Sequence, residues 1–207
     1  MDAYSKIKDD LVSFVRTWTK TGIINNPQIG GDFFSNMESI SSKYNFFKNE
    51  EEYILGFAKA YAKNQYLCTL PDGSLFQISY SFVMKNKRQR YVSKASLTYL
   101  PCVTEGVFDN DYIRLDYDVD NQNFFHPAAH LHVGFKGNFR LASNELLCFS
   151  EFFKFITYLY YPEIYLKLVG KDRIKHTLQT EEGKYTKQLP NSEELDDFVH
   201  LTTDKIK

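Results

Sequence analysis

Cysteine is scarce in this chain of 207 residues: Cys68, Cys102 and Cys148 are widely spaced and form no C-x-x-C pair. Such an odd, scattered set excludes a disulfide scaffold and favours a reducing compartment. No apolar run approaches the roughly 18 to 20 residues of a membrane span. Residues 1–14 carry charges throughout, unlike a signal peptide. We therefore expect a cytoplasmic protein without a membrane partner.

A dominant charge is also missing, because 25 Lys and Arg residues nearly balance 26 Asp and Glu residues and leave a net charge of -1. This balance excludes binding to nucleic acid or anionic membrane through overall charge, although a local basic patch can still act. Hydrophobic residues make up 43% and charged residues 25%, which argues against global disorder. The length fits a single domain over residues 1–207.

Aromatic residues are in excess, with 18 Phe and 15 Tyr against 10 Gly and 6 Pro. Codon bias in an AT-rich genome is one explanation. The alternative is an aromatic surface that stacks bases or grips a partner. Most of the rings recur at the spacing of core positions, so we assign most of them to the core.

A spacing of about 3.6 residues between apolar positions predicts helices at both ends of the chain. Asp32 and Asn49 are expected N-caps, as is Ser143 or Asn144 for a later helix rich in Phe, Leu and Tyr that Pro162 stops. The expected helices span residues 4–20, part of 32–47, 50–64, about 143–161, a short stretch after 163, and 192–200, with a mobile stretch near 181–187.

The period changes to two in the middle of the chain, which predicts strands. Phe76, Ile78 and Tyr80 share one side of the strand 75–84, and polar residues alternate with them. The expected strands span residues 66–70, 75–84, 90–100, 111–119, 128–135 and 138–142.

The expected fold class is α+β. It combines N-terminal helices over residues 1–64 with an antiparallel sheet of five or six strands over 65–142. Residues 143–207 would supply C-terminal helices, including the aromatic-rich helix packed on the sheet.

Three of the five histidines fall within seven residues, in the sequence HPAAHLH from His126 to His132. On a strand, His130 and His132 point to one side while Leu131 faces the core. Arg140, on the expected partner strand, is a candidate phosphate clamp. The hairpin register decides whether Arg140 shares the histidine face, and the sequence does not specify that register.

Three roles are open for this cluster. The histidines are structural on a half-buried sheet face, or they serve phosphate chemistry or nucleotide binding without a metal. Alternatively, they hold a divalent metal as the cofactor, with Asp118 added to the set His126, His130 and His132. The spacing matches no familiar template: Pro127 and the apolar alternation place it on a strand, and it lacks the Glu of H-E-x-x-H.

Asp116, Asp118 and Asp120 alternate just upstream of the histidines. They share a side if the strand continues, so they could join the histidines around a divalent ion. The alternative is a solvated strand face paired with Lys or Arg on a neighbouring strand. A calcium loop is excluded, because Asn121 replaces its glycine and Pro127 occupies the position of its bidentate Glu.

The turn at residues 85–91 is the one concentrated basic patch. Its candidate nucleic-acid-binding residues are Lys87, Arg88, Arg90 and Tyr91, which could contact a phosphate backbone and stack a base. The alternative is that this basic hairpin tip is a solvent-exposed turn without a binding role, which is common. No G-x-x-x-x-G-K-[ST], G-x-G-x-x-G or G-x-S-x-G motif is present, so nucleotide-loop and hydrolase-elbow chemistry has no support.

The stretch His126-Pro127-x-x-His130-Leu131-x-x-Gly134, followed by Arg140 and an aromatic helix ending at Pro162, resembles a bacterial family of unknown function. The resemblance covers residues 126–162. Such proteins are often encoded near phage-defence or mobile-element genes. The resemblance therefore implies a bacterial, cytosolic setting and gives weight to His126, His130, Gly134 and Arg140, without an established activity.

Two functions of different classes follow. The preferred one is a small cytosolic binding or assembly component of a bacterial multi-protein system, for example in phage defence, whose partner is another protein of the same operon. The alternative is a histidine-dependent phosphodiesterase or nuclease that acts on RNA or DNA, with or without a divalent metal. Its catalytic residues would be His126, His130, His132 and Arg140.

Overall fold

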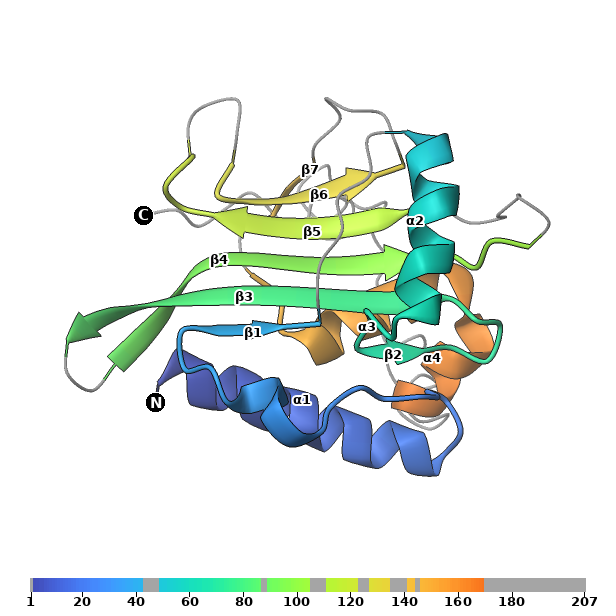
Figure 1. Cartoon of the computed structure of the whole chain (residues 1–207), viewed down its shortest axis with the longest axis horizontal. Helices are drawn as coiled ribbons and strands as arrows, with labels where there is room; N and C mark the ends of the chain where they lie inside the picture. The colour runs from blue at the N-terminus through green and yellow to red at the C-terminus, as the bar shows by residue number, and fades with distance from the viewer. Residues whose placement is uncertain are drawn as a thin grey trace, which may run out of the picture.

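The computed structural model describes residues 2–42, 49–86, 89–104, 111–122, 127–134, 141–143 and 146–169. Figure 1 shows its elements along the chain. These are α1 (Ala3–Lys20), a 3-10 helix η1 (Gly31–Phe34), β1 (Ser39–Ser41), α2 (Glu50–Ala62), β2 (Cys68–Thr69), β3 (Leu75–Asn86), β4 (Gln89–Leu100), β5 (Ile113–Asp118), β6 (Ala129–Val133), β7 (Leu141–Ser143), α3 (Phe149–Tyr160) and α4 (Pro162–Val169).

One antiparallel sheet carries the described strands in the order β1-β3-β4-β5-β6-β7, with β2 also paired to β3. The predicted α+β class and antiparallel sheet are therefore confirmed. The strand β1 was not predicted, because a helix was expected over part of residues 32–47. Only η1 is helical in the described part of that range, and Ser39–Ser41 pair with β3, which buries Ile40 completely. Tertiary pairing outweighs local helix propensity here.

The apolar face of the sheet packs against α1 and α3. Phe76, on this face of β3, contacts Phe153 of α3 with ring centroids 5.0 Å apart. Phe14 of α1 meets Phe149 and Phe153 edge to face, at 5.0 and 4.7 Å. Aromatic rings are thus a substantial part of this core, together with Ile and Leu side chains.

The predicted helix over 143–161 begins later than expected. Ser143 belongs to β7, whose residues pair with Ala129–Leu131 of β6, and α3 starts only at Phe149. Pro162 does end α3, but it also opens α4, where a proline at the first position leaves no hydrogen bond unmade. The C-terminal aromatic-rich helix packed on the sheet is confirmed, whereas the helix predicted near 192–200 and the mobile stretch near 181–187 lie outside the described residues.

The opposite, more polar face of the sheet is covered at one end by α2. Figure 1 shows α2 in front of the sheet and α3 behind it. The predicted cap is present, since the Asn49 side chain accepts a hydrogen bond from Glu52 N at 2.8 Å. Tyr53 and Phe57 of α2 form a second apolar cluster with Tyr112, just before β5. Polar side chains of β5 adjoin this cluster, since Arg114 donates to the Tyr112 hydroxyl at 3.2 Å.

Candidate histidine–aspartate site

The register of β5 and β6 brings the two strand histidines beside an acidic and a basic residue. His130 lies opposite Asp116, and His132 lies opposite Arg114. Residues opposite one another in an antiparallel pair share a face. His130 and His132 therefore lie on the same side, as the alternation with Leu131 predicted, and that side also carries Asp116.

Asp116 is the centre of this group. Its Oδ2 lies 3.3 Å from Nε2 of His132 and 4.0 Å from Nε2 of His130. The same oxygen accepts a hydrogen bond from Arg114 Nε at 2.8 Å, and Oδ1 accepts one from Ser96 Oγ at 2.7 Å. We call Asp116, His130 and His132 the triad.

The backbone holds the His130 ring in place. Its Nδ1 lies 2.9 Å from the carbonyl oxygen of Pro127, which can only accept, so Nδ1 donates this hydrogen bond. The His130 and His132 rings meet at a centroid distance of 4.8 Å. Exposure rises across the triad, from 2% for the His130 side chain to 12% for His132 and 21% for Asp116. Solvent therefore reaches the triad from the Asp116 side.

The electrostatics of the site favour a charged Asp116. Burial opposes the charge, but hydrogen bonds from His132 and Ser96 and the positive charge of Arg114 outweigh it and hold the pKa of Asp116 below its usual range. Arg114 is nearly fully buried, and its guanidinium also donates to the Tyr112 hydroxyl at 3.2 Å. The site thus contains a buried, hydrogen-bonded ion pair.

Two kinds of chemistry suit this arrangement. One nitrogen from each imidazole and one Asp116 oxygen all lie within 4.8 Å of one another, which matches the donor types that bind Zn²⁺ and similar ions. An imidazole beside a charged carboxylate can also act as a general acid or base. Among the described residues, this is the group of three His, Cys, Asp or Glu side chains placed to hold a metal.

The other predicted catalytic and metal-binding residues are not seen in the triad. His126 and Arg140 lie outside the described residues. Asp118 points to other partners, since its carboxylate accepts from Lys94 Nζ at 3.1 Å and Asn121 Nδ2 at 2.6 Å. This is the strand-face pairing with a neighbouring lysine that we considered for the acidic stretch.

Sequence reasoning missed Arg114 and Ser96. Arg114 stands two residues before Asp116, so the period-two pattern already placed it on the same side of the strand. Ser96 lies 20 residues away, and only the pairing of β4 with β5 sets it opposite Asp116. Its role had no signal in the sequence.

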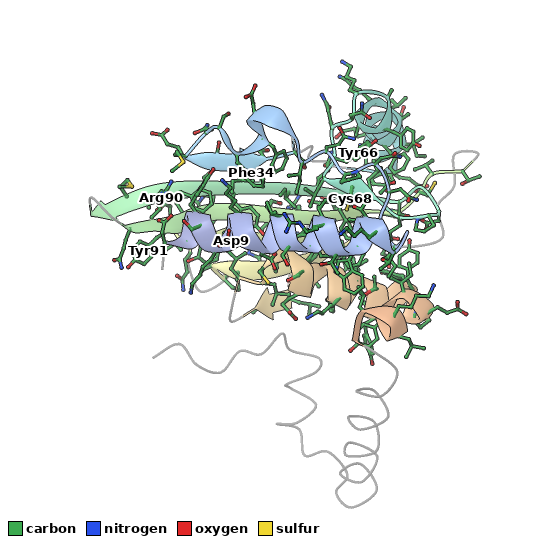
Figure 2. The ribbon with its side chains drawn as sticks, turned by 90° about the horizontal axis from the view of Figure 1, so that it is seen from below. Asp9, Phe34, Tyr66, Cys68, Arg90 and Tyr91 are labelled. Carbon is green, nitrogen blue, oxygen red and sulfur yellow. The ribbon has the colours of Figure 1, made fainter. Side chains whose placement is uncertain are left out.

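The predicted nucleic-acid-binding residues lie at the β3–β4 hairpin. Lys87 and Arg88 are outside the described residues. The Arg90 guanidinium pairs with Asp2 at 2.8 Å and lies over the Tyr4 ring at 4.5 Å, so it joins the hairpin to the start of α1. Tyr91 is largely exposed. Figure 2 labels Arg90 and Tyr91 at this end of the molecule, and their nucleic-acid role stays a prediction.

The three cysteines are free, with Cys68 buried and the other two half-buried, in agreement with the expected absence of disulfides. In the described part of the chain, no helix has the length and apolar character to cross a membrane.

Comparison with known proteins finds one family. The family model described as "Uncharacterized conserved protein (DUF2290)" matches residues 33–111 and 103–204, which include the triad. No curated protein and no solved structure matches the chain.

Proposed function

The chain belongs to the DUF2290 family of uncharacterized conserved proteins, and we propose that it is a binding or assembly component of a bacterial multi-protein system. The docking element in this proposal is the β3–β4 arm, which we define as Phe82–Asn86 and Gln89–Ser93. The finer setting, a cytosolic system of phage defence whose partner is encoded in the same operon, is part of the proposal and rests on the sequence resemblance.

The observation that carries the proposal is the projection of this arm. In Figure 1, β3 and β4 continue well past β5. Among the described strands, β5 pairs with β4 only over Lys94–Tyr99, and β1 pairs with β3 only over Ser39–Ser41 opposite Ser79–Ser81. Beyond Phe82, whose N–H donates to Glu38, the outer edge of β3 thus has no pairing strand in the described part of the chain.

The arm also exposes large apolar side chains. Val83 and Met84 are 52% and 60% exposed, and Tyr91, which pairs with Val83, is 43% exposed. An apolar strand edge left open invites pairing with another chain. The occupant that fits is an extended segment of a partner protein, added to β3 beyond the position where β1 already occupies the same edge.

The test is co-purification of the tagged full-length chain with the products of the genes adjacent to its own. A Val83→Asp/Tyr91→Asp variant should lose the partner at least about tenfold, because two charges at the arm oppose burial in an interface. Leu55→Asp on α2, where Leu55 is 69% exposed, is the matched control and should keep the partner. Equal loss in both variants, or no complex with any neighbouring product, would overturn the proposal.

The triad supports a second candidate function, a histidine-dependent phosphodiesterase or nuclease. It would use His130 and His132 as acid and base, with Asp116 orienting His132 through the 3.3 Å contact. The test measures cleavage of mixed RNA and DNA by wild type and by a His130→Ala/His132→Ala variant whose fold is checked by circular dichroism. Reactions contain Mg²⁺, Mn²⁺, Zn²⁺ or EDTA. Equal cleavage by both proteins, or none by either, would argue against this function.

A further inference from the structure

We propose that Asp116, His130 and His132 form a binding site for one divalent transition-metal ion of the Zn²⁺ class. The ligand atoms would be Nε2 of each histidine and Oδ2 of Asp116. This site does not depend on the docking function. In the metal-bound protein, His130 and His132 would be ligands and not the acid and base of the second candidate function.

The distances between the ligand atoms suit such an ion. Tetrahedral bonds of about 2.0–2.2 Å place neighbouring ligand atoms about 3.3–3.6 Å apart. Oδ2 of Asp116 lies 3.3 Å from His132 Nε2 and 4.0 Å from His130 Nε2, and all three donors lie within 4.8 Å of one another. The Asp116–His132 pair is already at this spacing, whereas His130 would have to move closer to Asp116 for one ion to reach all three residues.

The ligand side chains are oriented by hydrogen bonds of the kind found around protein metal sites. A metal-binding imidazole commonly donates its second ring N–H to a backbone carbonyl, which fixes the tautomer and aims the other nitrogen at the ion. His130 makes this contact to Pro127 O at 2.9 Å. Ser96 and Arg114 hold the Asp116 carboxylate from two directions, so its orientation is set without an ion.

Charge determines what else the site would accept. The Asp116 charge is already balanced by Arg114, and neutral histidines add none. A bound divalent cation would therefore leave the site positive, and three protein ligands leave a coordination position open. That position suits an anionic oxygen ligand, such as hydroxide or a phosphate oxygen. When the ion binds, the proton on His132 Nε2 moves to Nδ1 or to solvent, since only a free nitrogen lone pair can bind the metal.

The experiment measures Zn²⁺ and Co²⁺ binding to the full chain after removal of metal by a chelator, with calorimetry for Zn²⁺ and visible absorption for Co²⁺. Wild type should bind one equivalent and gain thermal stability with Zn²⁺. His132→Ala should weaken binding at least about tenfold, because loss of even a supporting contact costs about 10 to 100-fold. Asp116→Asn should weaken it similarly. Asp118→Asn, which changes the same chemical group two residues along the strand, should bind as wild type does.

Several results would overturn the site. They are the absence of saturable Zn²⁺ binding to wild type, unchanged affinity in folded His132→Ala, and an equal loss in Asp118→Asn, which would indicate adventitious surface binding. If Asp116→Asn does not fold, His132→Ala decides, since His132 is not the partner of the buried Arg114 guanidinium. No substrate is needed for these measurements. A protein that binds Zn²⁺ and cleaves nothing keeps this site and loses the phosphodiesterase function.

Discussion

The hydroxyl of Tyr161 donates a hydrogen bond of 2.7 Å to Oδ2 of Asp72, 89 residues earlier in the chain. Its oxygen also lies 2.6 Å from the Tyr99 hydroxyl and 3.0 Å from Ser74 Oγ. Because Tyr161 gives its proton to Asp72, Tyr99 is the donor in the tyrosine pair. Tyr161, at the junction of α3 and α4, is thus hydrogen-bonded both to the turn before β3 and to β4.

Tyr161→Phe should therefore lower the free energy of unfolding by about 1–3 kcal/mol, since it leaves three polar partners without this hydroxyl. Partial burial and the bond to Asp72 raise the pKa of Tyr161, so the hydroxyl stays protonated throughout the neutral range. Urea denaturation followed by circular dichroism measures the change. Tyr61→Phe on α2 is the control, because the Tyr61 hydroxyl makes no hydrogen bond to the described residues. An equal effect of the two substitutions would contradict the prediction.

Two successive residues of the arm should differ sharply in how much an alanine substitution lowers the free energy of unfolding. Phe82 is buried and meets the Tyr4 ring edge to face at 5.3 Å, so Phe82→Ala should cost about 3 kcal/mol or more. The next residue, Val83, faces solvent, and Val83→Ala should stay within about 0.5 kcal/mol of wild type. Thermal unfolding of the two variants checks both values. A large loss for Val83→Ala would show that the outer side of the arm is needed for folding and would weaken its assignment to docking.

The attachment of α1 to the arm should depend on acid pH. Partial burial opposes the charge of Asp2, but hydrogen bonds from Arg90 and Ser5 and the charge of Arg90 outweigh it and lower its pKa below the usual 3.8. A lowered folded-state pKa stabilises the protein above the unfolded value, and this contribution is lost as the pH falls through the folded value.

Asp2→Asn isolates this charge, because Asn is an equally good N-cap. Wild type should exceed Asp2→Asn in unfolding free energy by about 1 kcal/mol at about pH 6. The difference should shrink as the pH falls below 3.8 and through the lowered pKa of Asp2. Denaturant unfolding of both proteins over this range measures it. A difference that does not change with pH would show that Asp2 acts without its charge.

Much of the fold was predictable because the local patterns were strong. The period-two alternation in β3 and the Asn49 cap of α2 each identify an element without help from the rest of the chain. β1 is three residues long, too short for a periodicity, and exists because β3 offers it an edge. Local sequence therefore could not separate β1 from the helix expected there. β7 overlaps the predicted strand 138–142, but it extends to Ser143, which was expected to cap the following helix.

The candidate site was predictable only in part, for a related reason. The alternation of His130 with Leu131 fixed which side the histidines occupy. Selecting Asp116 over Asp118 required the register of β5 with β4 and β6, which sets Lys94 opposite Asp118 and His130 opposite Asp116. A shift of two residues would have exchanged the two carboxylates without changing the apolar pattern. The predicted metal-binding set, which contained Asp118, reflects this ambiguity.

The same two carboxylates should differ in what they contribute to stability. Asp116→Asn removes the negative charge beside Arg114, whose side chain is almost entirely buried, so the cost should be about 3 kcal/mol or more. Asp118→Asn affects a pair with Lys94 that is half exposed, and the cost should be about 1 kcal/mol or less. Urea unfolding of both variants in metal-free buffer measures these values. Adding Arg114→Met to Asp116→Asn should recover part of the loss, because the unpaired buried charge is then gone. Equal losses of unfolding free energy in the two single variants would contradict this prediction. They would show that the Arg114–Asp116 pair is as well solvated as a surface ion pair, so that the triad is not a buried, preorganised site.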